Sequence, residues 1–158
     1  ITSKIGISIY STKELELLTK KFNFDIVQCP FNIIDQRLKK SGWLYKLKDL
    51  NIEIHTRSSF LQGLLLMDKN NIPLKFRKWY CLWDKWDEYL HFNDLKKVDT
   101  CMSFCLMHTE IDKVIVGIDS FEQWNQILNI KMKKNIIDSI DISSTDEMLI
   151  NPSNWSKL

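Results

Sequence analysis

Residues 52–58 read Ile-Glu-Ile-His-Thr-Arg-Ser, a short β-branched run that ends in a guanidinium and a hydroxyl group. Runs of this length and composition predict β-strands. Three similar runs are Ile5–Ile9, Asp25–Cys29 and Lys113–Gly117. The ends of the four strands are marked by Ser8, by Gln28, by Arg57 with Ser58, and by Gly117 with Ser120. The sequence therefore predicts four strands that carry polar groups or glycine at their ends.

Helical patterns lie between these strands. Ser11 and Glu14 form a capping box ahead of the first helix, and Ser120 and Gln123 repeat it ahead of the last. Asp35 can cap a second helix. The apolar stripes are Leu15, Leu18 and Phe22 in the first helix, Leu38, Leu44 and Leu47 in the second, and Trp124, Ile127 and Leu128 in the last. Such spacing puts each stripe on one helix face.

The longest connection, residues 63–112, predicts two more helices, roughly Leu74–Leu90 and Asp94–His108. The residues expected to face inward from the second of these are Leu95, Val98, Cys101 or Met102, and Cys105. No linker or low-complexity segment divides the 158 residues, so the chain predicts one domain.

The alternation of strands and helices indicates an α/β fold with a parallel sheet covered by helices, because parallel neighbours need crossover connections. A doubly wound nucleotide fold would show a glycine-rich turn, but the four glycines form neither GxGxxG nor a P-loop. The other parallel solution is the (β/α)8 barrel, whose reactive groups lie where the strands end. We therefore expect the polar strand ends to form a binding rim.

Charge and composition exclude several classes of partner. The formal charge of +2 comes from 22 basic and 20 acidic side chains, so no strong field points to nucleic acid or anionic lipid. The longest apolar run, Leu64–Met67, is too short for a membrane span. Four cysteines without CxxC or metal spacing predict reduced thiols in a cytoplasmic protein, and no metal site.

Near the end, Lys131, Lys133 and Lys134 predict a solvated basic run, followed by an apolar pattern of Ile136, Ile137 and Ile140.

The motifs at the strand ends resemble those of a known family. They are Gly6-Ile-Ser8, Ile26–Asn32, Arg57–Leu65, Val114–Gly117 and Asn151–Trp155, and Arg57–Leu65 is the most specific. In this order they resemble the C-terminal half of an aldo/keto reductase. The resemblance implies a (β/α)8 barrel in which the four strands are the fifth to the eighth. Residues 1–158 would then be a single partial domain whose N-terminal half is absent, which agrees with a chain that opens on Ile1 and enters a strand almost at once.

The resemblance also implies a site for NADP or NAD. Ser8 and Gln28 match the groups that hydrogen-bond the nicotinamide carboxamide, and Arg57 stands where many members stack a tyrosine on the nicotinamide ring. The pyrophosphate would meet Ser58 and the backbone of Phe60, Leu61 and Gln62, and the adenosine would meet Gly117, Gln123 and Gln126. This chain departs from the family at Ile9, where an asparagine is usual. It departs again at Gln123, where an arginine often holds a 2′-phosphate, so NAD is at least as plausible as NADP.

The family's catalytic Asp, Tyr, Lys and His lie on strands that this chain lacks, so no catalytic residue is assigned and the segment alone should be inactive. The resemblance implies an oxidoreductase that acts on an aldehyde, ketone or sugar-like carbonyl. Two alternatives remain open at this point. One is a non-catalytic nucleotide-binding or regulatory barrel. The other is a half-barrel that pairs with a copy of itself, since its outer strands would expose unpaired backbone groups.

Other conspicuous side chains have simpler interpretations. The histidines His55, His91 and His108 are expected to be packed or solvated, with no role in acid–base chemistry. Cys101 and Cys105, at i and i+4, are expected to be a buried pair and not a metal site. The stripe Trp79, Trp83 and Trp86 could clamp a sugar, but packing against the barrel is the more usual fate of such a stripe.

Overall fold

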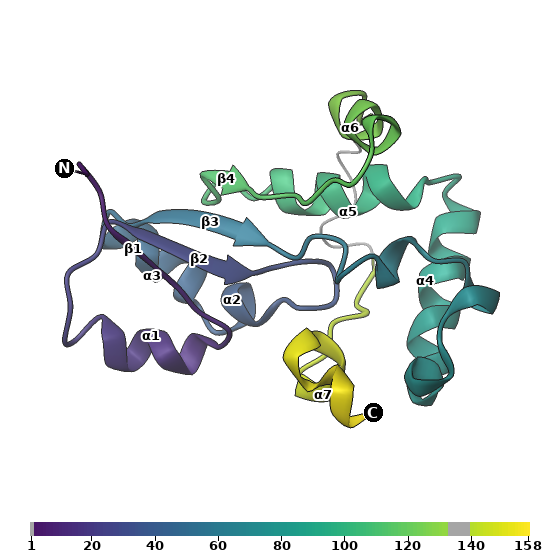
Figure 1. Ribbon diagram of the computed structural model, residues 1–158, viewed down its shortest axis with the longest axis horizontal. Coiled ribbons are helices and arrows are strands. Elements are labelled where there is room, and N and C mark those ends of the chain that lie inside the picture. The colour runs from purple at the N-terminus through teal and green to yellow at the C-terminus, as the bar shows by residue number, and fades with distance from the viewer. Residues whose placement is uncertain (1, 133–139) are drawn as a thin grey trace.

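The computed structural model describes residues 2–132 and 140–158 and contains one parallel four-stranded sheet. Its strands are β1 (Gly6–Ser8), β2 (Ile26–Pro30), β3 (Glu53–Arg57) and β4 (Lys113–Val114), in the spatial order β1-β2-β3-β4 (Figure 1). All three neighbouring pairs run parallel. The predicted α/β class and the four parallel strands are confirmed, and their C-terminal ends lie along one edge of the sheet.

The strand register separates a packed face of the sheet from an open one. Val27, Cys29, Ile54 and Thr56 are buried, whereas the residues between them are only partly covered. The open face carries one row in register, made of Ser8, Gln28, His55 and Lys113. Alternate residues of a strand point to opposite faces, so Arg57 lies on the same face as His55.

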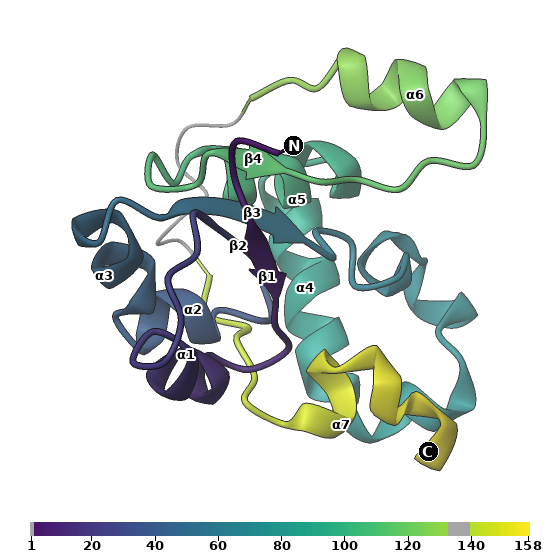
Figure 2. The same ribbon diagram turned by 60° about the vertical axis from the view of Figure 1, so that its left-hand side comes forward.

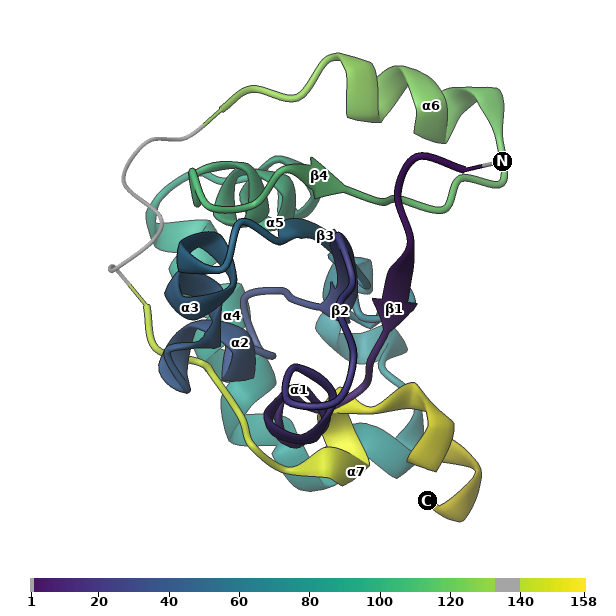
Figure 3. The same ribbon diagram turned by 90° about the vertical axis from the view of Figure 1, so that its left-hand side faces the viewer.

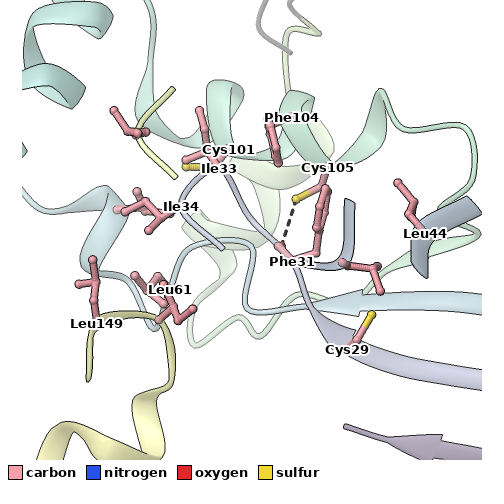
Figure 4. Close-up of a cluster of buried hydrophobic side chains, with 14 of the residues drawn as sticks. Cys29, Phe31, Ile33, Ile34, Leu44, Leu61, Cys101, Phe104, Cys105 and Leu149 are labelled. Atoms are coloured by element: carbon pink, nitrogen blue, oxygen red, sulfur yellow. Dashed lines mark hydrogen bonds between the residues drawn. The ribbon is translucent and has the colours of Figure 1, made fainter. Parts of the chain in front are cut away.

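The crossover helices lie on the packed side, as the end view of the sheet shows (Figure 3). They are α1 (Thr12–Leu18), α2 (Arg37–Lys40), α3 (Trp43–Asp49) and α5 (Lys97–Leu106). The core centres on the segment that follows β2. There the ring of Phe31 stacks on the ring of Phe104 of α5, with 5.3 Å between the ring centroids (Figure 4). In the same view Cys105 Sγ donates to the Phe31 carbonyl oxygen at 3.5 Å. These contacts attach α5 to the end of β2.

Local signals decide most element boundaries, with two corrections. The capping box of Ser11 and Glu14 is present, but α1 ends at Leu18, so Phe22 lies beyond the helix and is 60% exposed, contrary to the predicted stripe. The second predicted helix is broken into α2 and α3 at Gly42, whose φ is 79°. A left-handed residue cannot continue a right-handed helix, and glycine adopts that conformation without steric cost.

The long third crossover begins with 3₁₀ turns, of which the last is Leu74–Trp79, and only then enters α4 (Tyr80–Phe92). It continues through α5 to β4, so the helices predicted at Leu74–Leu90 and Asp94–His108 exist with shifted ends. Cys101, Met102 and Cys105 are buried, in agreement with the predicted inward face.

The last part of the chain is less embedded. β4 ends at Val114, three residues before the predicted Gly117, because only two of its residues pair with β3. Helix α6 (Phe121–Leu128) stands apart from the rest of the chain and buries none of its residues (Figure 2). The predicted stripe on it is therefore uncovered, with Trp124 45% and Leu128 62% exposed. The chain closes with α7 (Glu147–Ile150) and a 3₁₀ turn, Pro152–Lys157.

Part of the predicted tail is not described. Lys133, Lys134, Ile136 and Ile137 lie outside the described residues. Of their predicted companions, Lys131 is exposed and Ile140 packs against the core.

Candidate functional site

A cavity of about 580 Å³ opens where β3 and β4 end. Its walls are the loop after β3, the segment after β4, the inner side of α6 and Val98 of α5. The predicted cofactor-binding residues that line it are Arg57, Ser58, Phe60, Gln62, Gly117, Gln123 and Gln126. Residues up to 69 positions apart in the sequence thus share one cavity, from Arg57 to Gln126.

The loop after β3 has an unusual backbone. Leu61, Gln62 and Gly63 have consecutive positive φ angles of 47°, 54° and 83°, and Ser58 has a φ of 63°. Each such non-glycine residue costs about 1–2 kcal/mol, so the surroundings must hold the loop in place. Backbone N–H groups in a tight turn of this kind form a concavity that suits an anion. The loop therefore presents backbone donors at the cavity wall.

Buried groups anchor this loop from below. Leu61, one of the predicted cofactor-binding residues, is fully buried in the core and does not line the cavity. Its N–H donates to the Ser58 carbonyl oxygen at 2.9 Å, and Leu65 N–H donates to the Phe60 carbonyl oxygen at 3.2 Å. Trp86 Nε1 of α4 donates to the Leu65 carbonyl oxygen at 3.1 Å.

Asn32 is a site-forming residue that the sequence analysis did not single out. Its side chain is fully buried, and its Nδ2 donates to the Ser58 carbonyl oxygen at 2.9 Å. Its Oδ1 accepts from the N–H groups of Ile34 at 2.9 Å and Asp35 at 2.8 Å. One amide thus ties the segment after β2 to the loop after β3. The signal in the sequence is an asparagine two residues after the end of an apolar strand, inside the motif Ile26–Asn32.

Arg57 bridges the ends of β1 and β3. Its guanidinium lies 4.5 Å from the Tyr10 ring centroid, and Nη2 donates to the Ile9 carbonyl oxygen at 3.0 Å. Within the described part of the chain, no carboxylate forms an ion pair with it. Its Nη1 also donates to Ser58 Oγ at 3.5 Å. A guanidinium without a carboxylate partner keeps its charge available for an external anion.

Ser8 and Gln28 do not line this cavity. They are register partners on the open face of the sheet, and Ser8 Oγ donates to Gln28 Oε1 at 3.1 Å. Gln28 retains its amide N–H groups, which are the donors that a carboxamide oxygen would need. Ser8 and Gln28 thus contact each other on the open face of the sheet, which is also the face of Arg57.

The segment after β4 holds the other side of the cavity. Gln123 Oε1 accepts from Asp119 N–H at 2.7 Å, and Gln123 N–H donates to Ser120 Oγ at 3.2 Å. The bond to Ser120 Oγ confirms that Ser120 caps α6. The predicted capping box is not formed, because the Gln123 side chain accepts from the N–H of Asp119 and not from that of Ser120. Asp119 also lines the cavity, although the sequence analysis gave it no role.

Three of the four cysteine thiols lie in the core, where burial favours their neutral form. Burial raises the pKa of the Cys29 and Cys105 thiols to about 12 each, and it raises the pKa of Cys101 as well. The expected buried cysteine pair is thus present. In the described ranges, no group of three His, Cys, Asp or Glu side chains could hold a metal ion.

The remaining histidine and tryptophan predictions concern packing. His55 lies in β3 with its Nε2 2.7 Å from Glu53 Oε1, a partner that the sequence analysis had not assigned. His108 is buried and its Nδ1 is 2.8 Å from the Phe104 carbonyl oxygen, whereas His91 is exposed. Trp83 and Trp86 are buried and Trp79 packs against the core, as expected.

The model of the aldo/keto reductase family matches residues 1–149. A search of curated proteins finds no match. No helix in the described part of the chain has the length and apolar character needed to cross a membrane.

Among solved structures, the chain is similar to the aldo-keto reductase AKR11C1 from Bacillus halodurans. The apo form gives a TM-score of 0.60 at 19% identity over 90% of this chain and 47% of that one. The holo form gives a TM-score of 0.60 at 18% identity, over 85% of this chain and 44% of that one. The glycerol dehydrogenase AKR11B4 from Gluconobacter oxydans gives a TM-score of 0.50 at 14% identity, over 87% of this chain and 52% of that one. The chain thus spans about half the length of these structures.

Proposed function

The chain belongs to the aldo/keto reductase family, and on this premise we propose that it supplies most of the dinucleotide-binding rim of an NAD(P)-dependent oxidoreductase. The observation that supports this most directly is the shared cavity. Seven side chains or loop residues with an expected cofactor role line it, although they come from three separate segments of the chain. The parallel pairing of β3 and β4 brings these segments together, and the residues with an expected cofactor role are the ones that line the cavity between them.

The residues present fit a dinucleotide in their chemistry. In the left-handed turn Leu61–Gly63, Gln62 and Gly63 line the cavity and their N–H groups are the backbone donors, since that of Leu61 already bonds Ser58. Ser58 adds a hydroxyl, so together these groups suit a pyrophosphate. Ser8, Gln28 and Arg57 would meet the nicotinamide end, and Gly117, Gln123 and Gln126 the adenosine end. When bound, the cofactor supplies the hydride for reduction of a carbonyl. The role of this chain is to bind and orient it.

We further propose that the four strands are the fifth to the eighth of a (β/α)8 barrel, and that an N-terminal half completes it. The sheet has two unpaired edges, β1 and β4, and one open face with a polar row. The apolar side of α6 is also uncovered. Exposed edges and apolar faces need a partner. A coverage of about half of each similar structure supports the same proposal.

The catalytic groups would then lie in the N-terminal half. We therefore expect residues 1–158 alone to turn over no substrate, and the whole protein to act on an aldehyde, ketone or sugar-like carbonyl. We place the protein in the cytoplasm, because Cys29, Cys81, Cys101 and Cys105 are all free thiols, as is usual in a reducing compartment.

A binding experiment tests the cofactor assignment. NADH and NADPH are titrated into the full-length protein while nicotinamide fluorescence is followed. We expect Ser58→Ala and Arg57→Ala to raise the Kd by roughly 10-fold or more, since each removes a hydrogen bond to an anionic ligand. Matched controls are Ser153→Ala and Arg77→Ala, which are exposed and lie outside the cavity.

Two results would count against the proposal. If neither dinucleotide binds the full-length protein, the function itself is wrong. If binding is unchanged in both variants, Arg57 and Ser58 do not belong to the site. Thermal unfolding of each variant separates a lost contact from a lost fold.

A further inference from the structure

We propose that this chain carries a second site, separate from the proposed dinucleotide cavity, which binds a phosphate group. The site is a groove of about 270 Å³ between the start of α1, helix α2 and residues 143–145, which precede α7. The segment before α7 runs past α2 (Figure 3). The described residues that line this groove all differ from those that line the cavity at the ends of β3 and β4. Phosphate binding here therefore does not depend on the proposed function.

The lining of the groove favours an oxyanion. Five of its eight residues carry a hydroxyl group, two, Arg37 and Lys40, carry a positive charge, and the eighth is Gln36. In the described part of the chain no carboxylate lines the groove. A phosphomonoester has a charge of about −1.5 to −2 at pH 7, which two cations balance, and its oxygens accept hydrogen bonds from hydroxyl groups.

Arg37 is held by groups outside the groove and keeps two N–H donors. Its Nε donates to Asp35 Oδ1 at 2.9 Å, and its Nη2 donates to Asp35 Oδ2 at 2.8 Å and to the Tyr10 carbonyl oxygen at 3.0 Å. Asp35 is buried, so this pairing fixes the guanidinium. Nη1 lies 3.6 Å from the exposed Glu147 carboxylate, and its two N–H groups are available to an external acceptor. Because the guanidinium is already ordered, binding an anion costs little side-chain entropy.

Lys40 connects α2 to the segment before α7. Its Nζ donates to Ser143 Oγ and lies 3.4 Å from Asp141 Oδ1. An ammonium group has three donors, so one N–H remains for a ligand. The side chain of Asp141 is 75% exposed, so water screens its attraction for Lys40. A phosphate in the groove would therefore meet a second cation with a free donor.

Three hydroxyl groups at the groove have a hydrogen to donate. Within residues 2–132 and 140–158, the hydroxyls of Thr12 and Thr145 form no hydrogen bond. Ser144 Oγ accepts from Asp146 N–H at 3.1 Å, which leaves its own hydrogen for a further acceptor. The backbone of Ser144 is fixed, because its N–H donates to the Ile34 carbonyl oxygen at 2.9 Å. Donors from α1 and from the segment before α7 thus share one groove with the cations of α2.

The test measures phosphate binding to the full-length protein by isothermal titration calorimetry. Inorganic phosphate and glycerol 3-phosphate are titrated separately, which distinguishes a free phosphate from a phosphomonoester, and sodium chloride of equal ionic strength is the blank. Lys40→Gln removes a charge from the groove, and Thr145→Val removes a hydroxyl. Lys13→Gln is the matched control, since Lys13 is an exposed lysine of α1 outside the groove. Arg57→Ala reports on binding in the dinucleotide cavity.

We expect saturable binding of the phosphate group, and the ligand with the lower Kd identifies its source. Lys40→Gln should raise the Kd by about tenfold or more, and Thr145→Val by about threefold or more, since each removes a bond to an anion. Lys13→Gln and Arg57→Ala should leave the Kd unchanged. Saturating phosphate should raise the Tm of the unsubstituted protein, because a ligand that binds the folded state stabilises it, and should raise that of Lys40→Gln less.

Three results would overturn the inference. The first is that neither ligand binds more tightly than the chloride blank. The second is that Lys13→Gln weakens binding as much as Lys40→Gln does, which would indicate a general effect of charge. The third is that binding is lost in Arg57→Ala and kept in both groove variants, which would place the phosphate in the dinucleotide cavity. Thr145 is exposed, so Thr145→Val keeps the test valid even if Lys40→Gln destabilises the fold.

The same experiments distinguish this site from the proposed function. A protein that binds phosphate through Lys40 and Thr145 but binds neither NADH nor NADPH retains the groove site and contradicts the proposed function. A protein that binds a dinucleotide but no phosphate in the groove does the reverse.

Discussion

Glu53 is held by three nitrogen-bearing side chains on the open face of the sheet. His55 Nε2 lies 2.7 Å from its Oε1, Lys113 Nζ lies 3.1 Å from the same oxygen, and Lys4 Nζ lies 2.7 Å from Oε2. The hydrogen bonds from His55, Lys4 and Lys113, in that order, lower the pKa of Glu53 to about 2. The cluster ties the residue before β1 to the starts of β3 and β4. A single carboxylate thus helps to hold the N-terminal ends of the strands together.

This cluster predicts a pH dependence of stability. The pKa of Glu53 lies below its ordinary value of 4.5, so its stabilising effect is complete above that value and is lost as the pH falls toward 2. Glu53→Gln should therefore lower the free energy of unfolding at pH 7, and the difference should shrink as the pH falls through this window. Denaturant unfolding at several pH values measures it, with Glu16→Gln as the control. A difference that stays constant with pH would contradict the prediction.

The loop after β3 illustrates how one element depends on others. Its left-handed turn is strained, and its neighbours compensate through the buried side chain of Leu61, the Asn32 amide and the Trp86 indole. Asn32 satisfies two backbone N–H groups as well as one carbonyl. Removing it would leave the N–H groups of Ile34 and Asp35 without this partner, at a cost of about 1–3 kcal/mol each. The Ser58 carbonyl oxygen would keep only the bond from Leu61 N–H.

We therefore expect Asn32→Ala to destabilise the chain by about 2–4 kcal/mol, on the basis of the cost of buried unpaired groups. It should also weaken NADH binding, because the Ser58 carbonyl oxygen loses one of its two donors, the one that ties the loop to the segment after β2. Urea unfolding and the fluorescence titration check the two effects. Asn70→Ala is the control, since Asn70 is exposed and lies outside this loop. A change of less than about 0.5 kcal/mol, typical of surface substitutions, would show that Asn32 does not support the loop.

At the scale of the whole molecule, the chain exposes surfaces that folded proteins usually cover. β1 and β4 are edge strands, and Phe121, Trp124 and Leu128 lie exposed on α6. Under the proposed half-barrel, an N-terminal half covers these surfaces. Without that half, pairing of two copies along the free edges is the natural alternative.

We expect residues 1–158 alone to self-associate in a concentration-dependent manner in sedimentation velocity runs. The double substitution Trp124→Ser and Leu128→Ser should reduce this association, because it removes exposed apolar area from α6. Leu17→Ser, which removes an exposed leucine of α1, is the matched control. A compact monomer at all concentrations would contradict the prediction and would weaken the case for a missing half.

The sequence by itself determined the strand and helix order, the parallel sheet, the capping box of Ser11 and Glu14, and the Ser120 cap. These features are local, because a period of two residues, a β-branched run or a serine before a helix acts over a few positions. The same patterns wrongly predicted a buried Phe22, an unbroken second helix through Gly42 and a strand that reaches Gly117. In these places the backbone geometry or the extent of strand pairing overrides the local pattern.

Only the tertiary structure decided which strand-end residues share a cavity. It placed Ser8 and Gln28 against each other, turned the side chain of Leu61 into the core, and added Asn32 and Asp119 to the site. The Asn32 bond joins residues 26 positions apart, and the cavity is lined both by the loop after β3 and by α6. Contacts of this range depend on how the loops pack, and no local pattern in the sequence encodes them.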